Sequence, residues 1–193
     1  MTNDYADKPR CAWISDPLMR LYHDEEWGVE LHDDRKLFEF MVLDAFQAGL
    51  SWKTILNKRE NFRLVFDNFE PEIIAGYNEE KYEQLLADTG IIRNRAKIRA
   101  TITNAKAFLE VQKEFGSFDK YIWSFVDHQP VINSWHSLSE IPSKTGISDL
   151  MSKNLTKRGF KFVGSTICYS FMQAAGMVND HVVGCFRYKE VNG

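Results

Sequence analysis

The chain has 193 residues, of which 44% are hydrophobic and 13% aromatic, enough to bury one sizeable core but too few to require two domains. Its formal net charge of -3 excludes a whole-molecule attraction to nucleic acid but leaves room for a local basic face. Three cysteines, an odd number, argue against a disulfide framework and raise the question of metal binding.

The ends of the sequence indicate a simple domain organisation. We expect a polar tail over residues 1–9, one domain over residues 10–186 and a short tail over residues 187–193. The first ten residues lack the apolar segment of a signal peptide, and no later apolar run is long enough to cross a bilayer. We therefore expect a cytoplasmic protein with no membrane partner, and a monomer requires no special assumption.

Helical periodicity dominates the chain. Between Asp33 and Gly49, Leu37, Met41 and Ala48 recur at helical spacing, with Asp33 or Asp34 as a candidate N-cap and Gly49 as a natural stop. Further helices are predicted over 52–66, 78–88, 94–113, from Ser117 to 125, from Ser148 to about 159, and over 162–176. Because alternating strand patterns are absent, the expected fold class is an all-α helical bundle.

Two pairs of potential metal ligands lie near opposite ends of the chain. Cys11 and His23 are close to the N-terminus, and His181 and Cys185 are close to the C-terminus. Thiolate sulfur and imidazole nitrogen suit tetrahedral zinc, and a site filled by four protein ligands would be structural. The alternative is that these are ordinary thiols and surface histidines, and spacing alone does not choose between the two.

Asp44 lies on the apolar face of its predicted helix, three residues after Met41. Because a buried unpaired carboxylate is costly, Asp44 requires either a basic partner in an ion pair or a functional task. Trp13, Tyr22 and Trp52 flank it in sequence. Such aromatic residues usually form core, but rings around a fixed carboxylate would also suit the recognition of a flat base.

A glycine turn joins two predicted helices in the segment LLADTGIIRNRAK. The backbone N–H groups that follow Gly90, together with Arg93, Arg95 and Lys97, could bind a DNA phosphate. A second basic cluster contains Lys153, Lys157, Arg158 and Lys161. Basic runs are usually solvated faces and glycines between helices are usually caps, so each feature alone is weak evidence.

Four long motifs carry a specific resemblance: RCAWISDPLMRLYHDEEWG, LDAFQAGLSWKTILNKRENFR, GIIRNRAKI and KRGFKFVGSTICYSFMQAAGMVNDHVVGC. In this order, and over about residues 10–186, the chain resembles the 3-methyladenine DNA glycosylase I family of the helix-hairpin-helix superfamily. The resemblance implies an all-α glycosylase domain with a structural zinc ion (Zn²⁺) that joins the two ends of the chain. The implied ligands are the same four residues: Cys11, His23, His181 and Cys185.

The resemblance also implies a base pocket near Trp13, Tyr22, Asp44 and Trp52, in which Asp44 is the catalytic residue. Gly49 and Leu50 would lie at the gap left by the extruded nucleotide, with Leu50 as the wedge, and Gly90, Arg93 and Arg95 would contact the DNA. The implied reaction is hydrolysis of the N-glycosidic bond of 3-methyladenine in alkylated double-stranded DNA by base flipping, without strand cleavage.

Three positions depart from the family pattern. Asp44 replaces a glutamate, Met19 a frequent tyrosine, and Phe46, where some members carry a polar residue, is expected to add an apolar wall. Aspartate retracts the carboxylate by about 1.5 Å, the length of one C–C bond. One alternative is therefore a non-catalytic module that only binds alkylated DNA. Another is a zinc hydrolase, which would need an open coordination position at the metal.

Overall fold

The computed structural model describes residues 8–191, so residues 1–7 and 192–193 of the predicted tails lie outside the described part. Its helices are α1 Pro17–Glu25, α2 Asp34–Gln47, α3 Trp52–Leu56, α4 Arg59–Val65, α5 Pro71–Ala75, α6 Glu79–Ala87, α7 Arg95–Phe115, α8 Phe118–Trp123, α9 Gly146–Lys157, α10 Ser165–Ala174 and α11 Arg187–Glu190. Three 3₁₀ turns are η1 Asp67–Phe69, η2 Ser124–Val126 and η3 Leu138–Glu140.

The helix starts follow local capping chemistry. The predicted caps Asp33 and Ser117 each accept a hydrogen bond from a backbone N–H of the first turn of α2 and α8. The prediction of Ser148 as a cap is wrong. Thr145 is the cap of α9, and Ser148 accepts from its backbone N–H in a reciprocal capping box, so the helix starts earlier.

Other elements differ from the expectation because they are short. The predicted helix over 52–66 is divided into α3 and α4, and α1 and α5, each with proline in the first turn, were not predicted. The predominantly helical fold is confirmed, but the described residues also contain two parallel strands, β1 Val131–Ile132 and β2 Val178–Asn179. Two residues are too few for an alternating pattern to show. The predicted C-terminal tail begins with the helical turn α11.

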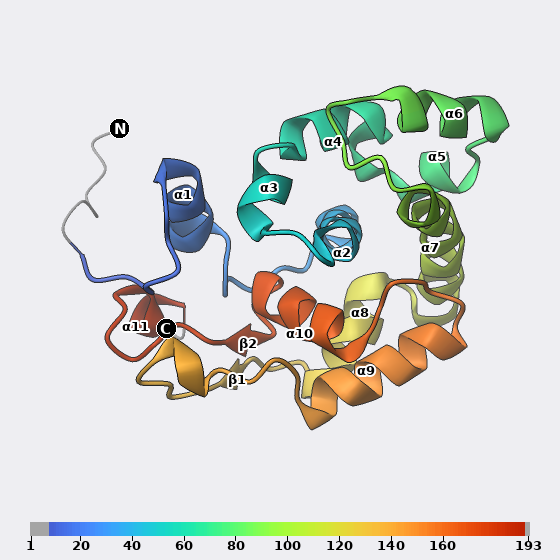
Figure 1. Cartoon of the computed structure of the whole chain (residues 1–193). Coiled ribbons are helices and arrows are strands. Elements are labelled where there is room, and N and C mark those ends of the chain that lie inside the picture. Colours follow the sequence, from blue (N-terminus) through green and yellow to red (C-terminus); the bar gives the residue numbers. More distant parts are fainter. Residues whose placement is uncertain (1–7, 192–193) are drawn as a thin grey trace.

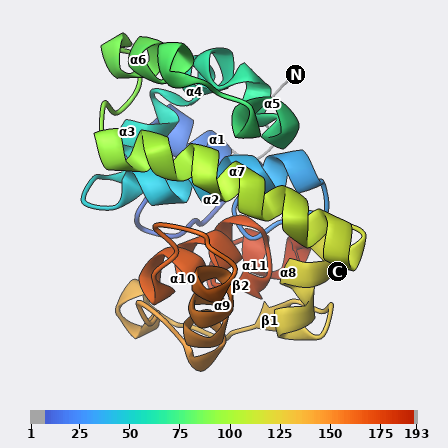
Figure 2. The same ribbon diagram turned by 90° about the vertical axis from the view of Figure 1, so that its right-hand side faces the viewer.

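Helix α2 is the central element of the core. Every residue from Leu37 to Phe46 is buried, because other helices cover α2 on all sides. Phe38 stacks edge-on against Phe108 of α7, with ring centroids 5.0 Å apart. Helix α7 crosses the middle of the molecule between α4–α6 on one side and α8–α10 on the other (Figure 2). Consequently, Glu39 and Asp44, the two polar side chains between Leu37 and Phe46, are buried.

The two ends of the described chain lie together. Helix α11 sits beside the segment that leads into α1 (Figure 1), and the Phe186 N–H donates to the carbonyl of Pro9 over 2.9 Å. The β1–β2 pair holds the chain immediately before Asp180 and His181. Among residues 8–191, no helix has both the length and the apolar character needed to span a bilayer.

Candidate functional site

A cavity of about 430 Å³ opens between α1, α2, α3 and α10. The four residues expected to form the base pocket, Trp13, Tyr22, Asp44 and Trp52, all line it. Its other walls come from Met19, Trp27, Gln47, Leu138, Ile141, Pro142, Ser143, Thr166, Tyr169, Ser170 and Gln173. The expected apolar wall from Phe46 is wrong: this ring is fully buried against Phe62, 4.9 Å away.

Helix α2 carries two buried carboxylates with opposite environments. Glu39 accepts from Arg59 over 2.6 Å and pairs with Arg63 over 2.8 Å. Asp44 is only 2% exposed, and its Oδ2 atom has no hydrogen-bond partner. None of the ion pairs between described residues includes Asp44, so the interpretation of Asp44 as half of a buried ion pair is wrong.

Burial has a direct electrostatic effect on Asp44. Loss of hydration disfavours the carboxylate and raises the pKa of Asp44 well above its ordinary range. Burial and the nearby Asp44 also raise the pKa of the Tyr22 hydroxyl, which keeps its proton. A cation placed in this cavity would supply the opposite charge that Asp44 lacks and would favour its ionised form.

Aromatic rings form the walls around Asp44. The ring centroids of Tyr22 and Trp52 are 5.3 Å apart, and those of Trp13 and Trp27 are 5.2 Å apart at a steep angle. The indole N–H of Trp52 is buried without a hydrogen-bond partner. The cavity therefore offers an unpaired acceptor, the Oδ2 atom of Asp44, and an unpaired donor, Nε1 of Trp52. Buried polar groups are rarely left unpaired, so the two atoms indicate a ligand site.

The loop after α2 forms one edge of this region. Gly49 has a φ of +85°, a left-handed conformation that favours glycine, and Leu50 is 42% exposed. Lys97, at the start of α7, donates to the carbonyls of Phe46 and Ala48 over 2.9 and 2.8 Å. Because these carbonyls end α2, Lys97 fixes the loop against α7. The prediction that Lys97 adds charge to a DNA surface is wrong, since its side chain is buried.

The hairpin between α6 and α7 is fixed by residues from α4 and the α3–α4 turn. Lys58 donates to the carbonyls of Thr89 and Gly90 over 3.0 and 3.3 Å. A Cβ atom at Gly90 would lie only 2.1 Å from the side chain of Asn61, so glycine is needed for this close approach. Arg93 and Arg95 are exposed beyond the turn. The hairpin is thus rigid and presents two cationic side chains to solvent.

The second candidate site is a buried cluster at the junction of the two ends. The ligand atoms of Cys11, His23, His181 and Cys185 all lie within 4.8 Å of one another, and all four residues are buried. The Cys185 sulfur is 3.4 Å from Nε2 of His23 and 3.6 Å from Nδ1 of His181. The Cys11 sulfur is 3.7 Å from the same His181 nitrogen. These four residues could hold one metal ion.

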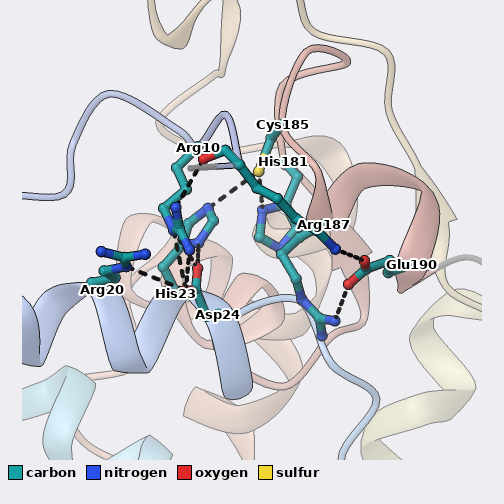
Figure 3. A network of polar contacts seen from close by, with 9 residues as sticks. Arg10, Arg20, His23, Asp24, His181, Cys185, Arg187 and Glu190 are labelled. Carbon is teal, nitrogen blue, oxygen red and sulfur yellow. Dashed lines mark hydrogen bonds and ion pairs between the residues drawn. The ribbon is translucent and has the colours of Figure 1, made fainter. Parts of the chain in front are cut away.

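Hydrogen bonds outside the cluster fix which imidazole nitrogens face its centre (Figure 3). Nδ1 of His23 is 2.8 Å from Asp24, which in turn accepts from Arg10. Nε2 of His181 is 3.0 Å from the carbonyl of Trp27. Because a carboxylate and a carbonyl only accept, both partners hold the ring N–H, and the opposite nitrogen is left as a lone-pair donor.

The electrostatics of the cluster favour a thiolate. Hydrogen bonding from the Cys11 thiol lowers the pKa of the Cys185 thiol far below its ordinary value. Partial burial alone would raise the pKa of the neighbouring Asp24 carboxyl. Hydrogen bonds from Arg10 and His23 outweigh this effect and lower that pKa. The outer carboxylate therefore stays charged and holds the His23 ring.

The sequence prediction missed the α10 wall of the cavity. Thr166, Tyr169, Ser170 and Gln173 all line it from a helix that is otherwise largely apolar. Successive members of this set are three, one and three positions apart in the sequence, so they lie on one face of the helix. That polar stripe on an apolar helix was the available signal. The segment 138–143 also lines the cavity, but it carries no comparable pattern.

Comparison with known proteins gives consistent matches over nearly the whole chain. The family model for methyladenine glycosylase matches residues 13–188. The chain is 56% identical over 180 residues to DNA-3-methyladenine glycosylase 1 of Escherichia coli (strain K12), covering 93% of this chain and 96% of that protein. It is 45% identical over 177 residues to the DNA-3-methyladenine glycosylase of Haemophilus influenzae, covering 91% and 96%.

Solved structures agree with these sequence matches. A crystal structure of 3-methyladenine DNA glycosylase I has a TM-score of 0.90 and 57% identity, over 92% of this chain and 98% of that one. A structure concerned with 3-methyladenine recognition by the Staphylococcus aureus enzyme has a TM-score of 0.90 and 33% identity, over 95% and 96%.

Proposed function

Since the chain belongs to the methyladenine glycosylase family and is therefore a DNA glycosylase, we propose that its substrate is 3-methyladenine in alkylated double-stranded DNA. The proposed reaction is hydrolysis of the N-glycosidic bond with release of the free base. The observation that carries this proposal is the unpaired carboxylate oxygen of buried Asp44 in an aromatic cavity. Methylation at N3 gives adenine a positive charge, so the base complements this carboxylate.

The reaction needs little acid catalysis, because a cationic base is already a good leaving group. Trp13, Tyr22 and Trp52 would surround the base by stacking and edge contacts, and Asp44 would accept from its amino group. Water would then attack the sugar carbon. Among the residues lining the cavity none is a lysine, which supports a monofunctional enzyme that forms no Schiff base and cleaves no strand.

Access to the cavity requires the nucleotide to leave the duplex. We propose that exposed Leu50 fills the gap left by the extruded base and that Gly49 permits the turn that presents it. The hairpin at Gly90, with exposed Arg93 and Arg95, would hold the DNA backbone by phosphate contacts. The hydrogen bond from Lys97 to the Ala48 carbonyl supports this arrangement, because it joins α7, which follows the hairpin, to the loop that carries Leu50.

We further propose that the Cys/His cluster holds a structural zinc ion. Bond lengths of about 2.3 Å to sulfur and about 2.0–2.1 Å to nitrogen place sulfur and nitrogen ligands of a tetrahedral ion about 3.6 Å apart. The three sulfur–nitrogen distances of 3.4–3.7 Å fit this value. When bound, the ion would supply a cross-link between the two ends of the domain. Four protein ligands leave no open position, which argues against a zinc hydrolase.

The test is product release from alkylated DNA. Purified protein should release free 3-methyladenine faster than buffer alone and leave the DNA strand intact at the abasic site. Leu50→Ala should slow release without lowering stability, since Leu50 is exposed. Binding of alkylated DNA without release above the uncatalysed rate would overturn the proposal in favour of a non-catalytic binding module.

A further inference from the structure

Asp180 is a buried carboxylate that the proposed chemistry does not use. It lies between β2 and His181, and it is 1% exposed. None of the ion pairs between residues 8–191 includes it. Four neutral donors bind it instead, and they divide evenly between its two oxygens. The two oxygens of Asp180 therefore contact different parts of the structure.

One oxygen faces structural partners. Oδ1 accepts from Nδ2 of Asn133 over 2.8 Å and from Nε1 of Trp135 over 2.7 Å. Both residues follow β1, so these bonds tie the β1 segment to the chain that carries His181. Neither Asn133 nor Trp135 lines the base cavity.

The other oxygen faces the base cavity through two side chains of α10. Oδ2 accepts from the Tyr169 hydroxyl and from Nε2 of Gln173, both over 2.7 Å. Both side chains line the cavity together with Asp44. Burial, and then the hydrogen bond to Asp180, raise the pKa of Tyr169, so its hydroxyl keeps the proton that it donates.

These bonds determine the polarity of the cavity wall. A hydroxyl has one hydrogen, and Tyr169 donates it to Asp180. The Tyr169 oxygen can therefore only accept a hydrogen bond from a bound base. Gln173 is held with its NH₂ group toward Asp180, which directs its carbonyl oxygen away from Asp180. Tyr169 and Gln173 therefore each present an acceptor oxygen, as Asp44 does. Acceptors complement the amino group of an adenine and repel the carbonyl oxygen of a 6-oxopurine such as guanine.

We propose that Asp180 is a positioning residue for base selectivity: by orienting Tyr169 and Gln173 as acceptors, it makes the cavity prefer 3-methyladenine over 3-methylguanine. The inference rests on the proposed function, because it assigns a cause to the choice of substrate at the same site. Asp180 acts only through the two α10 side chains and does not itself line the cavity.

Asp180→Asn reverses the hydrogen-bond polarity at almost constant shape. The new carbonyl can keep the bonds to Asn133 and Trp135, and the new NH₂ group then faces Tyr169 and Gln173. The Tyr169 hydroxyl would accept this bond and release its own hydrogen toward the cavity, and the Gln173 amide would turn over. Two acceptors thereby become donors, so the ratio of 3-methyladenine to 3-methylguanine excision should fall by about tenfold or more.

The matched control is Trp135→Phe, which removes one hydrogen bond from the other oxygen of the same carboxylate. It should leave the excision ratio unchanged. Tyr169→Phe, which keeps Asp180 and removes only the acceptor, should lower the ratio even if Asp180→Asn does not fold. Metal content and thermal unfolding are measured for each variant, because Asp180 adjoins His181.

For the wild type and each variant, the ratio of 3-methyladenine to 3-methylguanine excision is measured on one DNA that carries both bases. Binding of the two free bases is measured in parallel by tryptophan fluorescence. Equal losses for the two bases in Asp180→Asn and Tyr169→Phe, or a Trp135→Phe effect as large, would overturn the inference while leaving the glycosylase function intact. If the wild type released no base, the proposed function would fail. The binding ratio of the two free bases would still decide the role of Asp180.

Discussion

The environment of Asp44 predicts an unusual dependence of stability on pH. Its carboxylate is 2% exposed and one oxygen has no partner, so burial raises the pKa of Asp44 in the folded state. The unfolded chain releases the same proton at a pKa of about 3.9. Between these two pKa values the folded state holds the proton and the unfolded state does not. The free energy of unfolding contributed by Asp44 therefore falls as pH rises through this window.

Asp44→Asn removes this dependence and keeps the side-chain shape. The difference in unfolding free energy, variant minus wild type, should grow with pH by up to about 1.4 kcal/mol per pH unit and level off above the folded-state pKa. Urea unfolding of both proteins, from about pH 4 to about pH 8, measures it. Saturating free 3-methyladenine should stabilise the wild type more than the variant, because the Asp44 carboxylate is a stronger acceptor for the amino group of the base than a neutral amide.

Glu39→Gln is the matched control on the same helix. Glu39 is equally buried but is paired with Arg59 and Arg63, so neutralising it should destabilise the protein by about 1–3 kcal/mol at neutral pH. A difference between wild type and Asp44→Asn that stays constant with pH would refute the reasoning. So would a wild type that gains stability over the variant as pH rises, since that behaviour belongs to a paired carboxylate.

Three further predictions concern the supports of the site. Lys97→Met leaves two terminal carbonyls of α2 without their donor, so it should lower the free energy of unfolding in urea by about 1–2 kcal/mol and slow excision. Lys106 is exposed on the same helix, and Lys106→Met should have neither effect. Gly90→Ala drives a Cβ atom into Asn61, so titration should show weaker DNA binding; unchanged affinity would mean that the hairpin does not contact DNA. Elemental analysis should find one zinc per wild-type chain and less than one in Cys185→Ser, with a lower melting temperature; a metal-free wild type of equal stability would contradict this.

The sequence predicted the parts of the site that residue type and chemistry define together. Two Cys/His pairs nominated a metal cluster, and the fold brings all four ligand atoms within 4.8 Å. A carboxylate on an apolar helix face nominated Asp44, and the structure places it in the cavity with the predicted aromatic residues. In both cases residue type limits the possible roles: thiolate and imidazole groups suit a metal ion, and a buried carboxylate needs a partner or a functional task.

Features that depend on tertiary partners could not be predicted in the same way. Lys97 looks like its exposed neighbours Arg93 and Arg95, and only the carbonyl ends of α2 show why it is buried. None of the ion pairs between described residues includes Asp180, and the role proposed for it depends on donors from the segment after β1 and from α10. Pairings between distant segments leave no period in the sequence, so they escape an analysis based on helical spacing.

The central claim is that buried, unpaired Asp44 recognises the cationic base, and single-turnover excision by Asp44→Asn tests it most directly. The claim predicts that the variant binds alkylated DNA as tightly as the wild type and releases 3-methyladenine at least about 100-fold more slowly. Release at the wild-type rate by a folded Asp44→Asn protein would contradict it.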